Sequence, residues 1–238
     1  MDEQAIREAL RAAAAPFATA SPPPALELVC APLFCALAPA GAAVYPLALE
    51  FVYEGYLAHY REPRVLAADT TLSTRLLAGD HFDASGLRLV ARQGDLDAVK
   101  LLTRLMASLS WLRAEERPFA YDDDLWALCV AGIASGAAGG HAVAALHAFD
   151  EVARLFEHGR AERLPDLVRR SAASLWLRDP APLRAALRLD AVTSAAADTG
   201  AAAGGPDLPG GPGAPAASEP PLASEARADD TLPGEAAL

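Results

Sequence analysis

Apolar residues recur at spacings of three and four along residues 1–190, and sustained alternation of apolar and polar residues is nearly missing. This spacing places apolar side chains on one face of an α-helix. The clearest case begins after Gly94-Asp95 and ends at Pro118, with an apolar stripe of Val99, Leu102, Leu105, Met106, Leu109 and Leu112. The pattern predicts an all-α fold in which about eight helices form a bundle.

Interruptions of the pattern set the expected helix boundaries. Ser21-Pro22-Pro23-Pro24 is a stiff connector, and Asp69 or Thr70 is the expected N-cap of the helix that follows. Gly94-Asp95 forms a turn and the next cap. The expected helices cover about residues 2–15, 25–38, 44–60, 70–93, 95–118, 122–138, 141–157, 162–177 and 181–189.

The segment from Leu28 to Leu49 has no charged residue and is long enough to span a membrane. Pro32, Pro39 and Pro46 interrupt it, however, and each proline inside a helix costs about 3 kcal/mol. Two shorter buried helices joined at Pro39-Ala40-Gly41 are therefore favoured over a span. The acidic start of the chain also differs from the basic start of a signal peptide.

The composition changes near residue 190. Residues 191–238 consist mostly of Ala, Gly, Pro, Ser and acids, and contain no aromatic residue. Seven acids against Arg227 give this segment a charge of −6, out of −11 for the chain. A segment that can bury so little apolar surface is expected to be disordered. We therefore expect a helical domain over residues 1–190 and an acidic, disordered tail over 191–238.

Charge and cysteine content restrict the function classes. An acidic chain without a basic, aromatic-rich stretch is a poor nucleic-acid binder, because such binding depends on neutralising phosphates. The three cysteines, Cys30, Cys35 and Cys129, have neither metal-site spacing nor an even count. Free thiols are typical of reducing compartments, so a cytoplasmic location is expected.

No cluster of the sequence has the spacing of a catalytic or metal site. Asp122, Asp123 and Asp124 are consecutive, so on a helix they point about 100° apart and do not converge. They are better interpreted as an acidic first turn, which the helix dipole favours. The five histidines also lack the spacing of zinc hydrolases. Neither catalytic residues nor a bound metal are expected from these patterns.

One string, however, resembles a known signature. Leu76-Leu77-Ala78-Gly79-Asp80 is similar to the second core helix of the all-α polyprenyl diphosphate synthases, the isoprenoid synthase family. The stretch from Ala31-Pro32-Leu33 to His59 has the rhythm of that family's first core helices. The resemblance covers roughly residues 25–160 and includes small residues where helices must pack closely, namely Gly132, Gly136 and Gly140.

The resemblance also shows what the chain lacks. Members of the family hold a diphosphate through Mg²⁺ between two aspartate clusters. After His59, this chain has Tyr60 and Arg61 in place of the first cluster, and Asp150-Glu151 is a poor substitute for the second. The basic motif that grips the second substrate is replaced by residues 27–30. The resemblance therefore implies a non-catalytic member that binds no magnesium.

Some synthases of this family are heteromers whose small subunit has lost the aspartates, and this chain looks like such a subunit. The implied partner is a catalytic polyprenyl diphosphate synthase. The expected cavity wall or interface consists of Tyr53, Tyr56, Leu57, Tyr60, Leu76, Phe82 and Leu87. These aromatic and apolar residues are equally well explained as plain bundle core.

Two other interpretations stay open. The chain could be a homodimer that binds an isoprenoid or another lipid, with at most peripheral contact with a lipid phase. It could also be an active, divergent Mg²⁺-dependent prenyl transferase that uses Asp80 with Asp83, or Asp150 with Glu151. Asp80 and Asp83 are three residues apart and can share a helix face.

Overall fold

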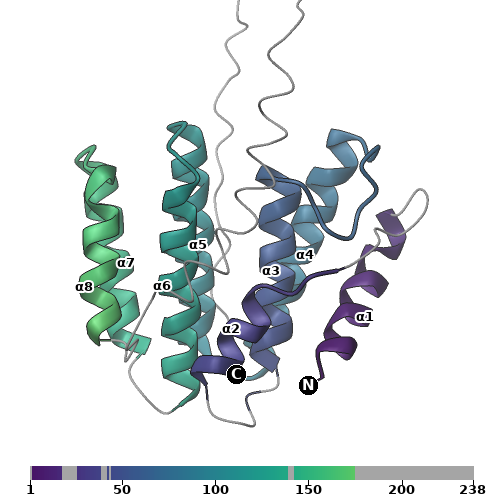
Figure 1. The fold of residues 1–238 in the computed structure, drawn as a ribbon, viewed down its shortest axis with the longest axis horizontal. Helices are drawn as coiled ribbons and strands as arrows, with labels where there is room; N and C mark the ends of the chain where they lie inside the picture. The colour runs from purple at the N-terminus through teal and green to yellow at the C-terminus, as the bar shows by residue number, and fades with distance from the viewer. Residues whose placement is uncertain (1, 18–25, 39–41, 43, 139–141, 175–238) are drawn as a thin grey trace, which may run out of the picture. The chain divides into compact units, whose positions relative to one another are not determined.

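The computed structural model describes residues 2–17, 26–38, 42, 44–138 and 142–174, and within these ranges the chain is all-α, without a strand. Eight α-helices and two short 3₁₀ turns form it (Figure 1). Their bounds are α1 (Glu3–Ala14), η1 (Ala15–Phe17), α2 (Cys30–Leu37), α3 (Val44–Tyr60), α4 (Leu72–Arg92), α5 (Leu96–Ala114), α6 (Ala120–Ala137), α7 (Ala142–Glu157), η2 (Ala161–Arg163) and α8 (Leu164–Ser174).

The predicted helices are confirmed within these ranges, but two are shorter than expected: the helix predicted over 25–38 begins at Cys30, and the one predicted to reach Pro118 ends at Ala114. The side chain of Asp95 accepts the backbone N–H of Ala98 at 2.9 Å, which makes it the expected cap of α5. The cap of α4 is Thr71, one or two residues later than the predicted Asp69 or Thr70. The expected helix over residues 181–189 and the tail over 191–238 lie outside the described residues.

The uncharged segment after Leu28 forms two helices, α2 and α3, as its prolines predict. Pro32 and Pro46 each lie in the first turn of a helix, where the missing N–H would have no intrahelical partner. Pro39-Ala40-Gly41, the expected joint, lies outside the described residues. Within the part of the chain that is described, no helix combines the length and the apolarity that a membrane crossing requires.

Helix α3 is central to the packing. It lies against α4 along most of its length, and it also contacts α1, α2 and α5 (Figure 1). A larger apolar core contains residues of α2, α3, α5, α6, α7 and α8. A smaller core connects α1 with α3 and α4 through Leu10, Phe51 and Phe82. Because α3 is buried without interruption from Pro46 to Ala58, no stripe in its sequence distinguishes a solvent face.

Glycines bring α3 and α4 close together. Gly79, from the Leu-Leu-Ala-Gly-Asp string, lies against the ring of His59, and a Cβ added there would come within 2.6 Å of His59 Nε2. A Cβ would also collide with a neighbouring side chain at two other glycines: with Asp83 at Gly55, and with Val52 at Gly86. The string therefore has a packing role here, because a larger residue at position 79 would displace the ring of His59 from the contact between the two helices.

The small residues expected at the later helix contacts behave similarly. A Cβ at Gly132 on α6 would collide with that of Ala145 on α7, and a Cβ at Gly136 would lie 3.3 Å from that of Ala142. The prediction of close packing at Gly132 and Gly136 is therefore confirmed. Gly140 lies outside the described residues.

Two buried carboxylates on α3 hold the segments on either side of it. Glu50 accepts the backbone N–H groups of Val29 and Ala31 at 2.7 and 2.9 Å, where α2 begins. Glu54 accepts those of Arg64 and Val65 at 2.7 and 3.0 Å. The guanidinium of Arg64 donates to both carboxylates, at 2.9 and 2.8 Å, and neighbouring negative charge keeps the pKa of Arg64 above its ordinary value.

Replacing Arg64 with leucine should lower the free energy of unfolding by about 3–5 kcal/mol, because Glu50 and Glu54 would stay fully buried without their counter-ion. Urea denaturation followed by circular dichroism measures this loss. Lys100→Ala is the control, since Lys100 pairs with Asp97 at the exposed surface and its loss should cost about 0–1 kcal/mol. Equal effects of the two substitutions would contradict the central role of Arg64.

Candidate functional site

Four aromatic residues meet where α3 faces α6. Tyr53 and Tyr56 are buried, and their rings lie edge-on to Trp126 at centroid distances of 5.0 and 5.8 Å. The ring of Tyr60 lies 5.7 Å from that of Tyr56, and Leu57 is buried in the same core. The structure thus brings together four of the residues that were predicted to form a wall or interface.

The other three predicted residues lie on α4, and of these Leu87 packs against the same core as the four above. Phe82 is buried in the smaller core beside Phe51, and Leu87 is half-buried on α4. Leu76 is 42% exposed and belongs to neither core. The sequence pattern does not separate these positions because each is an apolar residue in a helix, and only the packing of α4 decides which way it faces.

A cavity of about 260 Å³ lies between α3, α4, α5 and α6. Its apolar and aromatic walls are formed by Val52, Tyr56, Tyr60, Met106, Leu109 and Trp126, and its polar residues are His59, Asp80, Asp83 and Ser110. The indole N–H of Trp126 is buried and has no acceptor among the described residues. Such a space accepts a small, mainly apolar group with one polar end.

The polar residues of the cavity include two carboxylates and a histidine. His59 Nε2 lies 3.4 Å from Asp80 Oδ1 and 3.8 Å from Asp83 Oδ2. Burial, followed by the charge of Asp80, raises the pKa of Asp83 to about 7. Asp80 and Asp83 thus share one face, as their spacing predicts, whereas Asp150 and Glu151 diverge: Asp150 pairs with Arg104 at 2.8 Å and Glu151 lines a different groove.

Tyr60 and Arg61, which stand where the family resemblance would place metal-binding aspartates, are half-buried and contact neighbouring side chains. The guanidinium of Arg61 lies 3.8 Å from the ring centroid of Phe119 and donates to Tyr56 Oη at 3.0 Å. Tyr60 Oη lies 3.0 Å from Ser110 Oγ. A cation and a phenol, both engaged with neighbouring side chains, cannot supply the oxygen ligands that magnesium requires.

The three consecutive aspartates form the first turns of α6, as expected, but they are buried rather than solvated. Asp122 accepts hydrogen bonds from Tyr56 Oη at 2.6 Å and from Arg113 at 2.9 Å. Burial raises the pKa of Asp122 to about 6, although both hydrogen bonds and the charge of Arg61 oppose the rise. The sequence did not reveal this network because its partners come from α3 and α5.

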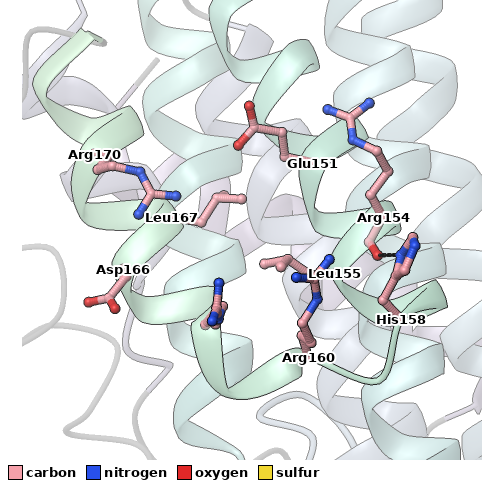
Figure 2. A pocket seen from close by; sticks show the side chains of 9 residues that line it. Glu151, Arg154, Leu155, His158, Arg160, Asp166, Leu167 and Arg170 are labelled. Atoms are coloured by element: carbon pink, nitrogen blue, oxygen red, sulfur yellow. Dashed lines mark hydrogen bonds between the residues drawn. The ribbon is translucent and has the colours of Figure 1, made fainter.

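A second concave site lies between α7 and α8 (Figure 2). This arginine groove has a volume of about 560 Å³ and is lined by Glu151, Arg154, Leu155, His158, Arg160, Arg163, Asp166, Leu167 and Arg170. Sequence reasoning missed it, because the arginines have no regular spacing. The only available signal was their density between residues 154 and 170, in a chain that is otherwise acidic.

No family model, curated protein or solved structure matches this chain. Within the described ranges, no three His, Cys, Asp or Glu side chains are arranged to hold a metal ion. The function must therefore be argued from the α3–α6 cavity, the exposed faces of the helices and the arginine groove.

Replacing Asp83 with asparagine should weaken the pH dependence of stability. Because the folded state holds the Asp83 proton up to about pH 7 and the unfolded state releases it near pH 3.8, stability falls as pH rises through this window. Asparagine has no proton to lose, so above pH 7 the variant should be more stable than the native chain by about 1–4 kcal/mol.

Urea denaturation at pH 5 and pH 8 measures this difference, and the exposed Asp69→Asn is the control. Part of the decline should persist in Asp83→Asn, since Asp122 loses its proton near pH 6 in both proteins. If Asp83→Asn declined as steeply as the native chain, the proton would not reside on Asp83.

Proposed function

We propose that this chain is a non-catalytic, isoprenoid-synthase-like helical protein that acts as the small subunit of a heteromeric polyprenyl diphosphate synthase. The observation that carries the proposal is an exposed apolar face on α4. Leu72, Leu76 and Leu77 are 68%, 42% and 61% exposed, and they are three of the five large apolar side chains exposed among the described residues. Apolar residues gathered in this way mark protein interfaces.

The apolar face borders the cavity. Leu72 and Leu76 are one turn apart, and Asp80, which lines the cavity, follows one turn later on the same side of α4. A partner that covered Leu72, Leu76 and Leu77 would therefore lie next to His59 and Asp80. This position suits a subunit that helps to shape the tunnel of a catalytic partner and so affects product length.

The surroundings of His59 favour a non-catalytic role. Arg61 places a positive charge where the resemblance requires carboxylates, and a cation there opposes magnesium binding. The remaining acidic pair is weakened as a ligand set, because the raised pKa of Asp83 leaves it partly protonated at neutral pH. Turnover would therefore depend on the partner's own aspartate clusters.

The second candidate, a homodimer that binds lipid, is favoured by the cavity alone. Its volume of about 260 Å³ falls below the roughly 300–1,000 Å³ of typical small-molecule sites. It can enclose a short apolar group but not a long polyprenyl chain. A subunit that completes a partner's tunnel fits this size better than a carrier that encloses the lipid by itself.

Co-expression with the catalytic polyprenyl synthase of the same host tests the proposal. The two chains should co-purify in near-equal amounts, and the partner's products should change in length when this chain is present. Failure of both would overturn the subunit assignment. A homodimer that retains a lipid on purification would support the second candidate instead.

Replacing both Leu72 and Leu77 with glutamate should abolish co-purification, because two charges would be buried in the interface. Folding should be preserved, since both residues are exposed and an acid at Leu72 lies in the first turn of α4, where the helix dipole favours it. Leu96→Glu is the control, as Leu96 is 65% exposed but lies at the start of α5, beyond the far end of α4. If Leu96→Glu lost binding while the double variant kept it, the interface would not lie on the α4 face.

A further inference from the structure

We propose that the arginine groove between α7 and α8 binds a soluble molecule that carries a diphosphate group or two neighbouring phosphates. This site is separate from the cavity and from the α4 face, and the inference does not rest on the proposed subunit function. It follows from the charge, the shape and the hydrogen-bonding capacity of the groove.

The positive charge of the groove is uncompensated. Arg154, Arg160, Arg163 and Arg170 are all exposed, and none has an ion pair or a side-chain hydrogen bond to another described residue. Among other arginines of the bundle, Arg64 and Arg113 pair with buried carboxylates, whereas Arg88 and Arg92 on α4 are exposed and have no ion pair among the described residues. What distinguishes the groove is that four guanidiniums without an ion pair to a described residue line one concave site, in a chain with net charge −11, and this local excess of positive charge favours an anion as ligand.

Two acids line the same groove but do not cancel this charge. Asp166 forms its ion pair with Arg169, at 2.7 Å, and Arg169 is not part of the groove. Glu151 is exposed and has no ion pair among the described residues. With Asp166 paired to Arg169, the four arginines face Glu151 as the remaining lining acid, which leaves the groove a net charge of about +3.

The arginines approach from two sides. Arg154 lies on α7, Arg160 and Arg163 lie in the connection that leads through η2, and Arg170 lies on α8. Figure 2 shows Leu155 and Leu167 between Arg170 and Arg160, so that apolar side chains form the floor and cations form the rim. A concave site of this kind suits a compact ligand in solution better than the flat surface of a membrane.

The chemistry of arginine favours phosphate over carboxylate. Each guanidinium presents parallel N–H donors that match two oxygens of one phosphate, and four of them supply more donors than one phosphate can accept. A diphosphate group offers more acceptor oxygens and more negative charge. His158 adds a ring next to Arg154, whose backbone oxygen lies 2.6 Å from His158 Nδ1. Since a carbonyl only accepts, Nδ1 carries a proton, and Nε2 can donate to a phosphate oxygen only when the ring holds a second proton.

Calorimetric titration of the full-length chain with inorganic diphosphate, at fixed ionic strength and without divalent metal, tests the proposal. The native chain should bind diphosphate, and Arg163→Gln/Arg170→Gln should weaken binding more than tenfold. The matched control is Arg88→Gln/Arg92→Gln, which removes the same charge from two exposed arginines of α4. It should change the affinity less than twofold.

Further titrations distinguish other anions. Monophosphate should bind more weakly than diphosphate, and acetate should not compete at the same ionic strength. Equal weakening by both double variants would indicate a general charge effect and overturn the site. The proposal would also be overturned if the chain did not bind diphosphate but sedimented with vesicles of anionic phospholipid. Binding of an acidic peptide as tightly as diphosphate would overturn it as well.

Discussion

The structure depends on two carboxylates buried in the middle of α3. Glu50 and Glu54 are fully buried, and such charges are tolerated inside a protein only when hydrogen bonds and a counter-ion surround them. Arg64 and the backbone N–H groups at the start of α2 meet that requirement together. The position of α2, the path of the chain after α3 and the orientation of α3 are thereby fixed by one network.

Fixing α3 also determines what surrounds the cavity. One side of the helix places Gly55 and His59 against α4, where Gly79 permits the close approach. Tyr53 and Tyr56 contact Trp126 of α6. Glu54 binds the backbone of Arg64 and Val65, a few residues after Arg61. Arg61 itself stacks on Phe119 and donates a hydrogen bond to Tyr56. The side chain of Arg61 is therefore held by its contact with Phe119, just before α6, as well as by its hydrogen bond to Tyr56 on α3.

Much of the fold follows from the sequence, because local signals specify it. The stripe from Leu102 to Leu112 and the Asp95 cap predict α5 closely, and Gly132 indicates a tight helix contact. The site is less accessible to such reasoning. In the sequence, Asp122 is an acid in the first turn of a helix. Its hydrogen bonds with Tyr56 and Arg113 come from other helices, so the local pattern does not predict them. Leu76 differs from its buried neighbours only in the direction that the packing of α4 gives it.

The distribution of charge separates the molecule into two chemically different places. Arg64 and Arg113 form ion pairs with buried acids, and Arg61 stacks against Phe119, so these three cations beside α3 are already engaged within the protein. The cavity there presents His59, Asp80 and Asp83 at its polar end. Four exposed arginines without an ion pair to a described residue line the groove between α7 and α8. An anionic group would thus be held away from the cavity, and the α4 face and the arginine groove can serve different ligands without competing for the same side chains.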